Sequence, residues 1–202
     1  DLNNDNFNIK EPFKGLFTQG MVCHETYKDK NNNWLSPDEV EKKGDKYVVK
    51  GKEGEFVKVG PSESMSKSKK NVIDPEFIIE NYGADSVRLF ILSDSPPEKD
   101  VQWSEQGMVS SYKFIQKLWI LHKQIKKKID EEKNISIDNN IEKFTNQTIA
   151  KITSNLEKFN YNVIIANIYE TYNFLVKEID KDYKAVIIKE NYIKILILMM
   201  PV

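Results

Sequence analysis

The sequence predicts a protein in two parts, a mixed α/β part up to about Trp103 and an all-helical part after it. Short runs of β-branched and aromatic residues, separated by glycine and asparagine, predict strands before residue 60. The Pro96-Pro97 pair interrupts the chain, and beyond Trp103 apolar residues recur at helical spacing. We therefore expect one structural unit over residues 1–103 and a helical bundle over residues 104–202.

The first strand is predicted over residues 12–22, where Gly20 would let another backbone segment approach closely. Downstream, Ser36 and Glu39 have the spacing of a capping box. That spacing predicts a short helix ending at Gly44.

A β-hairpin is predicted next, with arms at 46–49 and 55–59 around a glycine-containing turn. Gly60 and Pro61 are expected to end it. The hairpin would lead the chain into the following loop, so its stiffness would limit where that loop reaches. We expect residues 28–50 to be a structural insertion with no part in chemistry.

A basic, serine-rich loop follows over residues 62–71 and is the segment around which the chain is organised. It carries three lysines within four residues, at 67, 69 and 70, beside small hydroxyl side chains. Positive charge without bulk would let a polyanion such as pyrophosphate lie close to the backbone. A solvated surface loop, or a basic patch that binds RNA loosely, has the same composition.

Two helices are predicted directly after this loop. Asp74 is expected to cap the first, with Pro75 as its first residue and Gly83 as its stop. Asp85 is expected to cap the second, which runs to about residue 92. The second helix places three apolar residues on one side, Val87, Phe90 and Ile91.

The spacing of apolar residues predicts helices throughout the second half of the chain. Ser104 is the expected N-cap of a helix over 105–133, whose far end carries lysines at 123 and 126–128 that could contact phosphates or form a solvated face. Later helices are expected on either side of Asn160-Tyr161-Asn162, and another from Tyr192. The expected apolar stripe of the first helix is Met108, Tyr112, Ile115, Trp119, His122, Ile125 and Ile129.

Composition limits the function classes. Lys+Arg number 30 and Asp+Glu 31, so overall charge gives no argument for nucleic-acid binding, and any RNA contact must be local. A single cysteine, Cys23, excludes an internal disulfide and a thiolate metal cluster, and its neighbour His24 would point to the opposite strand face. The single cysteine favours a reducing cytoplasm, and no signal peptide or membrane span is predicted. We expect the chain to be a fragment of a longer protein.

The ordered motifs now point to a family. Met65-Ser66-Lys67-Ser68-Lys69-x-Asn71-x-x-Asp74-Pro75, followed by Tyr82-Gly83-Ala84-Asp85-x-x-Arg88, resembles the KMSKS signature and stem-contact helices of class I aminoacyl-tRNA synthetases. The stretches 11–22 and 93–103 resemble the leucyl-tRNA synthetases of bacterial type, because the valine, isoleucine and methionine enzymes usually read differently there. The similarity covers nearly the whole chain and weakens after about residue 135.

The resemblance implies a Rossmann-type catalytic portion with stem-contact helices, then part of an anticodon-binding helical bundle. It implies ATP-dependent activation of leucine and transfer to tRNA(Leu), with Mg²⁺ as cofactor, by a monomer. Lys67 would be the catalytic residue. ATP would be bound by Met65, Ser66, Lys67 and Ser68, no metal would be held by these residues, and Asp74 and Arg88 would be structural.

Two departures from the family pattern are visible. Ser64 replaces the first lysine of the signature, although Lys69 or Lys70 could supply some of the missing charge. The family's HIGH motif is absent, since neither His24 nor His122 lies beside a second histidine and glycine. We therefore expect half an active site and no turnover by this chain alone. The alternatives are a non-catalytic RNA-binding or assembly module and a synthetase for another branched aliphatic amino acid.

Overall fold

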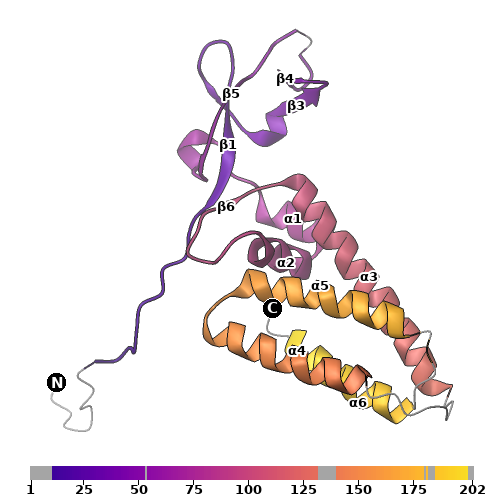
Figure 1. The fold of residues 1–202 in the computed structure, drawn as a ribbon. Helices are drawn as coiled ribbons and strands as arrows, with labels where there is room; N and C mark the ends of the chain where they lie inside the picture. Colours follow the sequence, from indigo (N-terminus) through magenta and orange to yellow (C-terminus); the bar gives the residue numbers. More distant parts are fainter. Residues whose placement is uncertain (1–10, 53, 132–139, 180, 182–184, 200–202) are drawn as a thin grey trace, which may run out of the picture.

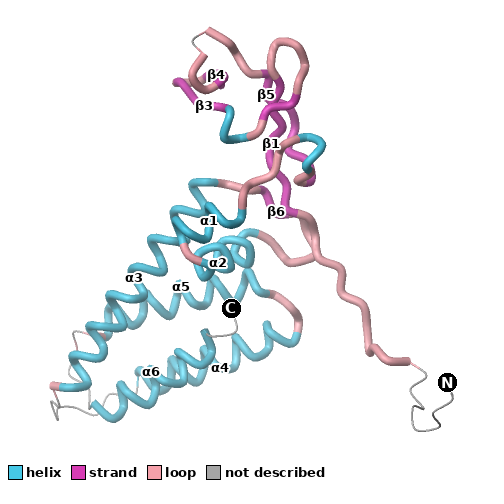
Figure 2. Tube along the Cα trace, turned by 180° about the vertical axis from the view of Figure 1, so that it is seen from behind, coloured by secondary structure: helices cyan, strands magenta, loops and turns pink. Residues whose placement is uncertain are grey.

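The computed structural model describes residues 11–52, 54–131, 140–179, 181 and 185–199. Within these residues the strands lie at one end of the molecule and the long helices at the other, with two shorter helices between them (Figures 1 and 2). The strand-containing part comes first in the chain, so the two predicted parts are both present in the predicted order.

The central strand of the sheet is β1 (Val22–Lys28). Strand β5 (Lys58–Ser64) runs antiparallel along one side of it. The other side is shared by two short strands, β2 (Trp34–Leu35), antiparallel at one end, and β6 (Val101–Gln102), parallel at the other. The predicted strand over 12–22 is wrong, because exposed residues 11–19 have no strand partner among the described residues and pairing starts at Val22.

Gly20 does allow the close backbone approach that its type predicts. Its N–H donates to the Pro97 carbonyl over 2.8 Å. A methyl group at this position would lie 2.1 Å from the carbonyl oxygen of Lys99, which is a backbone atom that cannot swing aside.

The Gly20→Ala substitution should therefore destabilise the chain by about 1–3 kcal/mol, the usual cost of overpacking. Gly15→Ala is the matched control, because its added methyl group meets no described atom within 4 Å outside the residue itself and its two chain neighbours. Urea unfolding of both variants measures the difference. Equal midpoints for the two variants would show that the Gly20 contact is not a constraint.

The predicted short helix at 36–44 is replaced by a single 3₁₀ turn and a strand. The capping box is present, but the turn covers only Pro37–Glu39, and β3 (Val40–Lys43) begins at once. Strand β4 (Lys46–Val49) pairs antiparallel with all of β3 and so satisfies the backbone groups that a helix would have used.

The predicted hairpin is only partly correct. Val48 forms a bridge with Phe56, and the Val57 N–H donates to Tyr47 O over 2.9 Å, but from Lys58 the chain leaves to pair with β1. Gly60 and Pro61 do not end the strand. Pro61 is an extra residue in β5, a β-bulge, which an edge strand accommodates because proline lacks the N–H for a ladder bond.

Helices α1 (Pro75–Tyr82) and α2 (Ala84–Asp94) form a platform beside the sheet. The cap at Asp74 is confirmed, since its carboxylate accepts from the Glu76 N–H over 3.0 Å. Gly83 ends α1 with φ of 79° and is itself the N-cap of α2. The expected cap at Asp85 is therefore wrong, and this residue lies in the first turn of α2.

The helical part consists of α3 (Glu105–Asp130), α4 (Asn140–Glu157), α5 (Tyr161–Glu178) and α6 (Ala185–Met199). Ser104 caps α3 as predicted, accepting from the Gly107 N–H over 3.1 Å. Helix α6 begins earlier than expected, and most of the expected link at 134–140 lies outside the described residues. None of the described helices combines the length and apolar character that a membrane span requires.

The buried face of α3 differs from the predicted stripe. Met108 and Ile125 of the predicted stripe are buried, but Trp119 is 63% exposed, and Ser111, Phe114 and Leu121 are buried although the apolar spacing did not single them out. The buried residues of α3 are Met108, Ser111, Phe114, Leu121 and Ile125.

Two buried clusters connect the platform to the bundle. Leu89 of α2 packs with Phe114, Ile152 and Ile164 from three helices of the bundle. Phe90, the next residue of α2, packs with Met108 of α3. Two neighbouring residues of α2, Leu89 and Phe90, therefore anchor the platform in the helical bundle through two separate buried clusters.

Candidate functional site

The basic loop is shorter than predicted. Ser62, Glu63 and Ser64 belong to β5, and Ser64 lies opposite Cys23 of β1. The last backbone hydrogen bond between these two segments runs from the Met65 N–H to the Val22 carbonyl oxygen over 3.1 Å. The loop proper therefore covers residues 65–71 and starts directly at the end of a paired strand.

A 3₁₀ turn, η2 (Lys67–Lys69), gives the loop its shape. Ser66 is its N-cap, and the Ser66 hydroxyl accepts from the Lys69 N–H over 3.3 Å. The Ser68 hydroxyl lies 3.2 Å from that of Ser66. Lys70 ends the turn in the left-handed region with φ of 54°. The Ser66 hydroxyl thus orders the turn that begins with Lys67.

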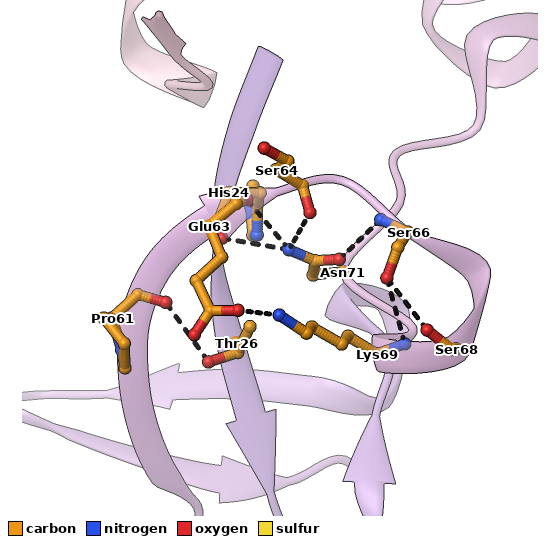
Figure 3. Close-up of polar contacts among 9 residues, drawn as sticks. All are labelled: His24, Thr26, Pro61, Glu63, Ser64, Ser66, Ser68, Lys69 and Asn71. Atoms are coloured by element: carbon orange, nitrogen blue, oxygen red, sulfur yellow. Dashed lines mark hydrogen bonds and ion pairs between the residues drawn. The ribbon is translucent and has the colours of Figure 1, made fainter. Parts of the chain in front are cut away.

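The three lysines of the loop are not equivalent. Lys69 forms an ion pair with Glu63 of β5 (Figure 3), and Lys70 Nζ lies 3.5 Å from Glu39 Oε2. Lys67 is exposed, and among the described residues no acidic side chain pairs with it. The loop therefore presents one uncommitted ammonium group, that of Lys67.

Two hydrogen bonds from Ser36 hold the carboxylate of Glu39 in place. Its carboxylate accepts from the Ser36 N–H over 2.8 Å and from the Ser36 hydroxyl over 2.9 Å. These two hydrogen bonds, with a smaller contribution from the charge of Lys70, hold the pKa of Glu39 below its ordinary value. Glu39 lies in the segment 28–50, which we expect to take no part in chemistry, and its contact with Lys70 joins that segment to the loop.

Asn71 is the residue of this site to which the sequence assigned no role. Its side chain is completely buried and contacts both strands and the loop (Figure 3). Its Nδ2 lies 3.2 Å from His24 O, 3.1 Å from Glu63 O and 3.4 Å from Ser64 O, and its Oδ1 accepts from the Ser66 N–H over 2.9 Å. An asparagine in a basic loop carries no local signal of such burial.

The adjacent cysteine and histidine do not form a catalytic pair. Cys23 is buried, with its thiol 3.9 Å from Met21 O, whereas His24 Nδ1 lies 2.8 Å from Glu25 O. The interpretation of Cys23 as a packing residue is confirmed. Across the described ranges there is no group of three or more His, Cys, Asp and Glu side chains that could hold a metal ion.

The predicted basic end of α3 is partly used within the protein. The Lys128 ammonium donates to the carbonyls of Ile179 and Lys181 at the end of α5, and Lys127 Nζ lies 3.8 Å from Glu131. Lys123 and Lys126 are exposed. Any phosphate contact at this end of α3 would therefore depend mainly on these two residues.

Comparison with known proteins places these features in a family context. A family model for class I tRNA synthetases (I, L, M and V) matches residues 54–104, which include the loop and platform. A leucine–tRNA ligase from Rickettsia massiliae is 47% identical over 174 residues, covering 86% of this chain and 21% of the relative. One from Granulibacter bethesdensis is 44% identical over 174 residues, covering 84% of this chain and 20% of the relative.

Among solved structures, the ternary complex of an Agrobacterium radiobacter LeuRS with tRNA and LeuAMS superposes with a TM-score of 0.60. It is 22% identical and covers 68% of this chain and 19% of that chain. This likeness confirms the predicted fold class, a class I synthetase α/β portion followed by a helical bundle. The chain spans about a fifth of the length of the curated relatives that it matches.

Proposed function

This chain is a relative of the leucine–tRNA ligases, and we propose that it supplies the mobile-loop half of an active site that joins leucine to tRNA(Leu). The reaction is ATP-dependent formation of leucyl-adenylate, followed by transfer of the leucyl group to tRNA. The observation that carries the proposal is the isolation of Lys67, the one loop lysine without an acidic partner in the described part of the chain.

Lys67 is proposed to act on the departing pyrophosphate. When the leucine carboxylate attacks the α-phosphate of ATP, negative charge accumulates on the leaving group. An ammonium group that engages this charge best in the transition state lowers the barrier. A compact charge on a flexible stem at the start of a short, exposed turn suits that role.

Met65, Ser66 and Ser68 are the other proposed ATP-contacting residues. The Ser66 hydroxyl already accepts a hydrogen bond inside the turn. We propose that its main contribution is to shape the loop and that the exposed Ser68 hydroxyl is the one that reaches the nucleotide. The serine side chains are small, so phosphates can approach the loop backbone here.

The serine at position 64 leaves the loop with less charge than the family signature has. Ser64 is a paired residue of β5, and the ammonium groups of Lys69 and Lys70 face Glu63 and Glu39. We therefore propose that neither lysine replaces the missing charge and that Lys67 carries the electrostatic task from this side of the site.

Mg²⁺ is the cofactor that the family reaction uses to share the charge of the phosphates. Glu63 and Glu39 are the carboxylates that contact the loop, and each already faces a lysine ammonium. These two carboxylates therefore do not form a site for the ion, and Lys67 is the residue of this loop that we propose to share the charge of the pyrophosphate with Mg²⁺.

The arrangement of the parts fits a protein that contacts tRNA along its length. We propose that residues 1–103 belong to the catalytic domain and residues 104–202 to the anticodon-binding bundle. The exposed lysines on α3, Lys123 and Lys126, are candidate phosphate contacts of that bundle.

The test is amino-acid-dependent ATP–pyrophosphate exchange by the full-length parent protein, assayed separately with leucine, isoleucine, valine and methionine. Exchange with leucine alone is the expected result. Exchange with another of these amino acids would reassign the substrate, and no exchange with any of them would favour the non-catalytic RNA-binding module.

A further inference from the structure

The side chain of Asn71 occupies a polar pocket at the end of the β1–β5 pair. Its exposed fraction is 0%, and every polar atom of its carboxamide has partners. The two N–H groups face three carbonyl oxygens, and the carbonyl oxygen faces one N–H. This set of partners fixes the orientation of the amide, because the reversed amide would place oxygen against three carbonyls.

A short chain of hydrogen bonds leads from this amide to Lys67. Asn71 Oδ1 holds the Ser66 N–H, and the Ser66 hydroxyl in turn holds the Lys69 N–H and so closes the 3₁₀ turn. Lys67 is the residue directly after Ser66 and the first residue of the turn. The position of its backbone relative to β1 and β5 is therefore set by the Met65 N–H bond to the Val22 carbonyl and, at Ser66 itself, by the buried side chain of Asn71.

We infer that Asn71 is a positioning residue, which fixes the turn carrying Lys67 against the sheet so that the ammonium group meets the leaving pyrophosphate. This inference rests on the proposed function. Asn71 touches no substrate in this role, because its side chain is buried between the loop and the two strands. The ion pairs of Lys69 and Lys70 also hold this loop, but both are half-exposed and therefore weak, whereas the Asn71 amide is buried and bonds directly to Ser66.

The test is the Asn71→Asp variant of the full-length parent. Aspartate has nearly the same shape and can still accept from Ser66, but its second oxygen faces the three carbonyls that Nδ2 contacts. We expect kcat for leucine-dependent ATP–pyrophosphate exchange to fall about tenfold, because a small misplacement of a catalytic group has effects of this size or larger. The KM for leucine should remain unchanged.

A double-mutant cycle with Lys67→Ala separates positioning from general stability. If Asn71 acts through Lys67, adding Asn71→Asp to Lys67→Ala should lower kcat by less than about twofold further. Asn146→Asp, an exposed change on α4 with the same charge, is the matched control and should leave exchange unchanged.

The inference is overturned if folded Asn71→Asp keeps the wild-type kcat. It is also overturned if the fold decrease in kcat of the double variant equals the product of the decreases of the two single variants. Thermal unfolding identifies a variant that does not fold, in which case the same cycle is run with Asn71→Ser. An inactive wild type would instead refute the proposed function. If kcat falls in Lys67→Ala but not in Asn71→Asp, only the present inference is refuted.

Discussion

Replacing Lys67 with alanine should lower leucine-dependent ATP–pyrophosphate exchange by the full-length parent on the order of 10²-fold, the scale of removing one transition-state contact. The physical reason is that no neighbouring charge can take over. Lys69 is paired with Glu63, and Lys70 is held near Glu39. The loss should appear mainly in kcat, because the contact strengthens as the pyrophosphate departs.

Lys43→Ala is the matched control for this experiment. Lys43 is an exposed lysine on β3, so the substitution removes the same charge without touching the loop. It should leave exchange within twofold of the wild type, since isolated surface charges contribute little. A Lys67→Ala enzyme with normal exchange, or an equal loss in the control, would show that Lys67 has no special role.

Ile152→Ala should destabilise the 202-residue chain by about 2–5 kcal/mol, the range for removing a large aliphatic side chain from a packed core. Ile152 is 1% exposed and lies in the cluster that contains Leu89, Phe114 and Ile164. The substitution leaves a cavity where α2 meets the bundle, so it should loosen the support of the platform as well as α4.

Urea unfolding followed by circular dichroism measures this change. The control is Ile120→Ala, the same substitution at a helical isoleucine that is 58% exposed, which should cost less than about 1 kcal/mol. If the two variants unfold at the same urea concentration, the buried cluster does not stabilise the joint between platform and bundle.

The sequence predicted the helix caps at Asp74 and Ser104 correctly and the strand partners poorly, for a physical reason. The caps at Asp74 and Ser104 depend on hydrogen bonds within three residues, so local spacing is sufficient evidence for them. The pairing of β5 with β1 joins residues thirty or more positions apart. Its extension through Pro61 overrode a local signal for a strand end.

The same distinction applies to the candidate site. The motif identified Lys67 as the candidate catalytic residue, but the sequence left open whether Lys69 or Lys70 supplies the charge missing at Ser64. That separation comes from Glu63 and Glu39, which reach the loop from β5 and from the turn before β3. The burial of Asn71 also arises from the carbonyls at the strand ends, which only the folded chain brings together.

The bulge in β5 has a consequence for how this chain can change over generations. Thr26 lies opposite Gly60 and Glu25 lies opposite Ser62, which leaves Pro61 as the surplus residue between two paired ones. Losing its codon would keep Glu63 opposite His24, and the side chains before and after the bulge would stay on their own faces. A one-residue deletion at Pro61 would therefore keep the register of the strand that leads to the basic loop, while removing the carbonyl that accepts from the buried Thr26 hydroxyl over 3.2 Å.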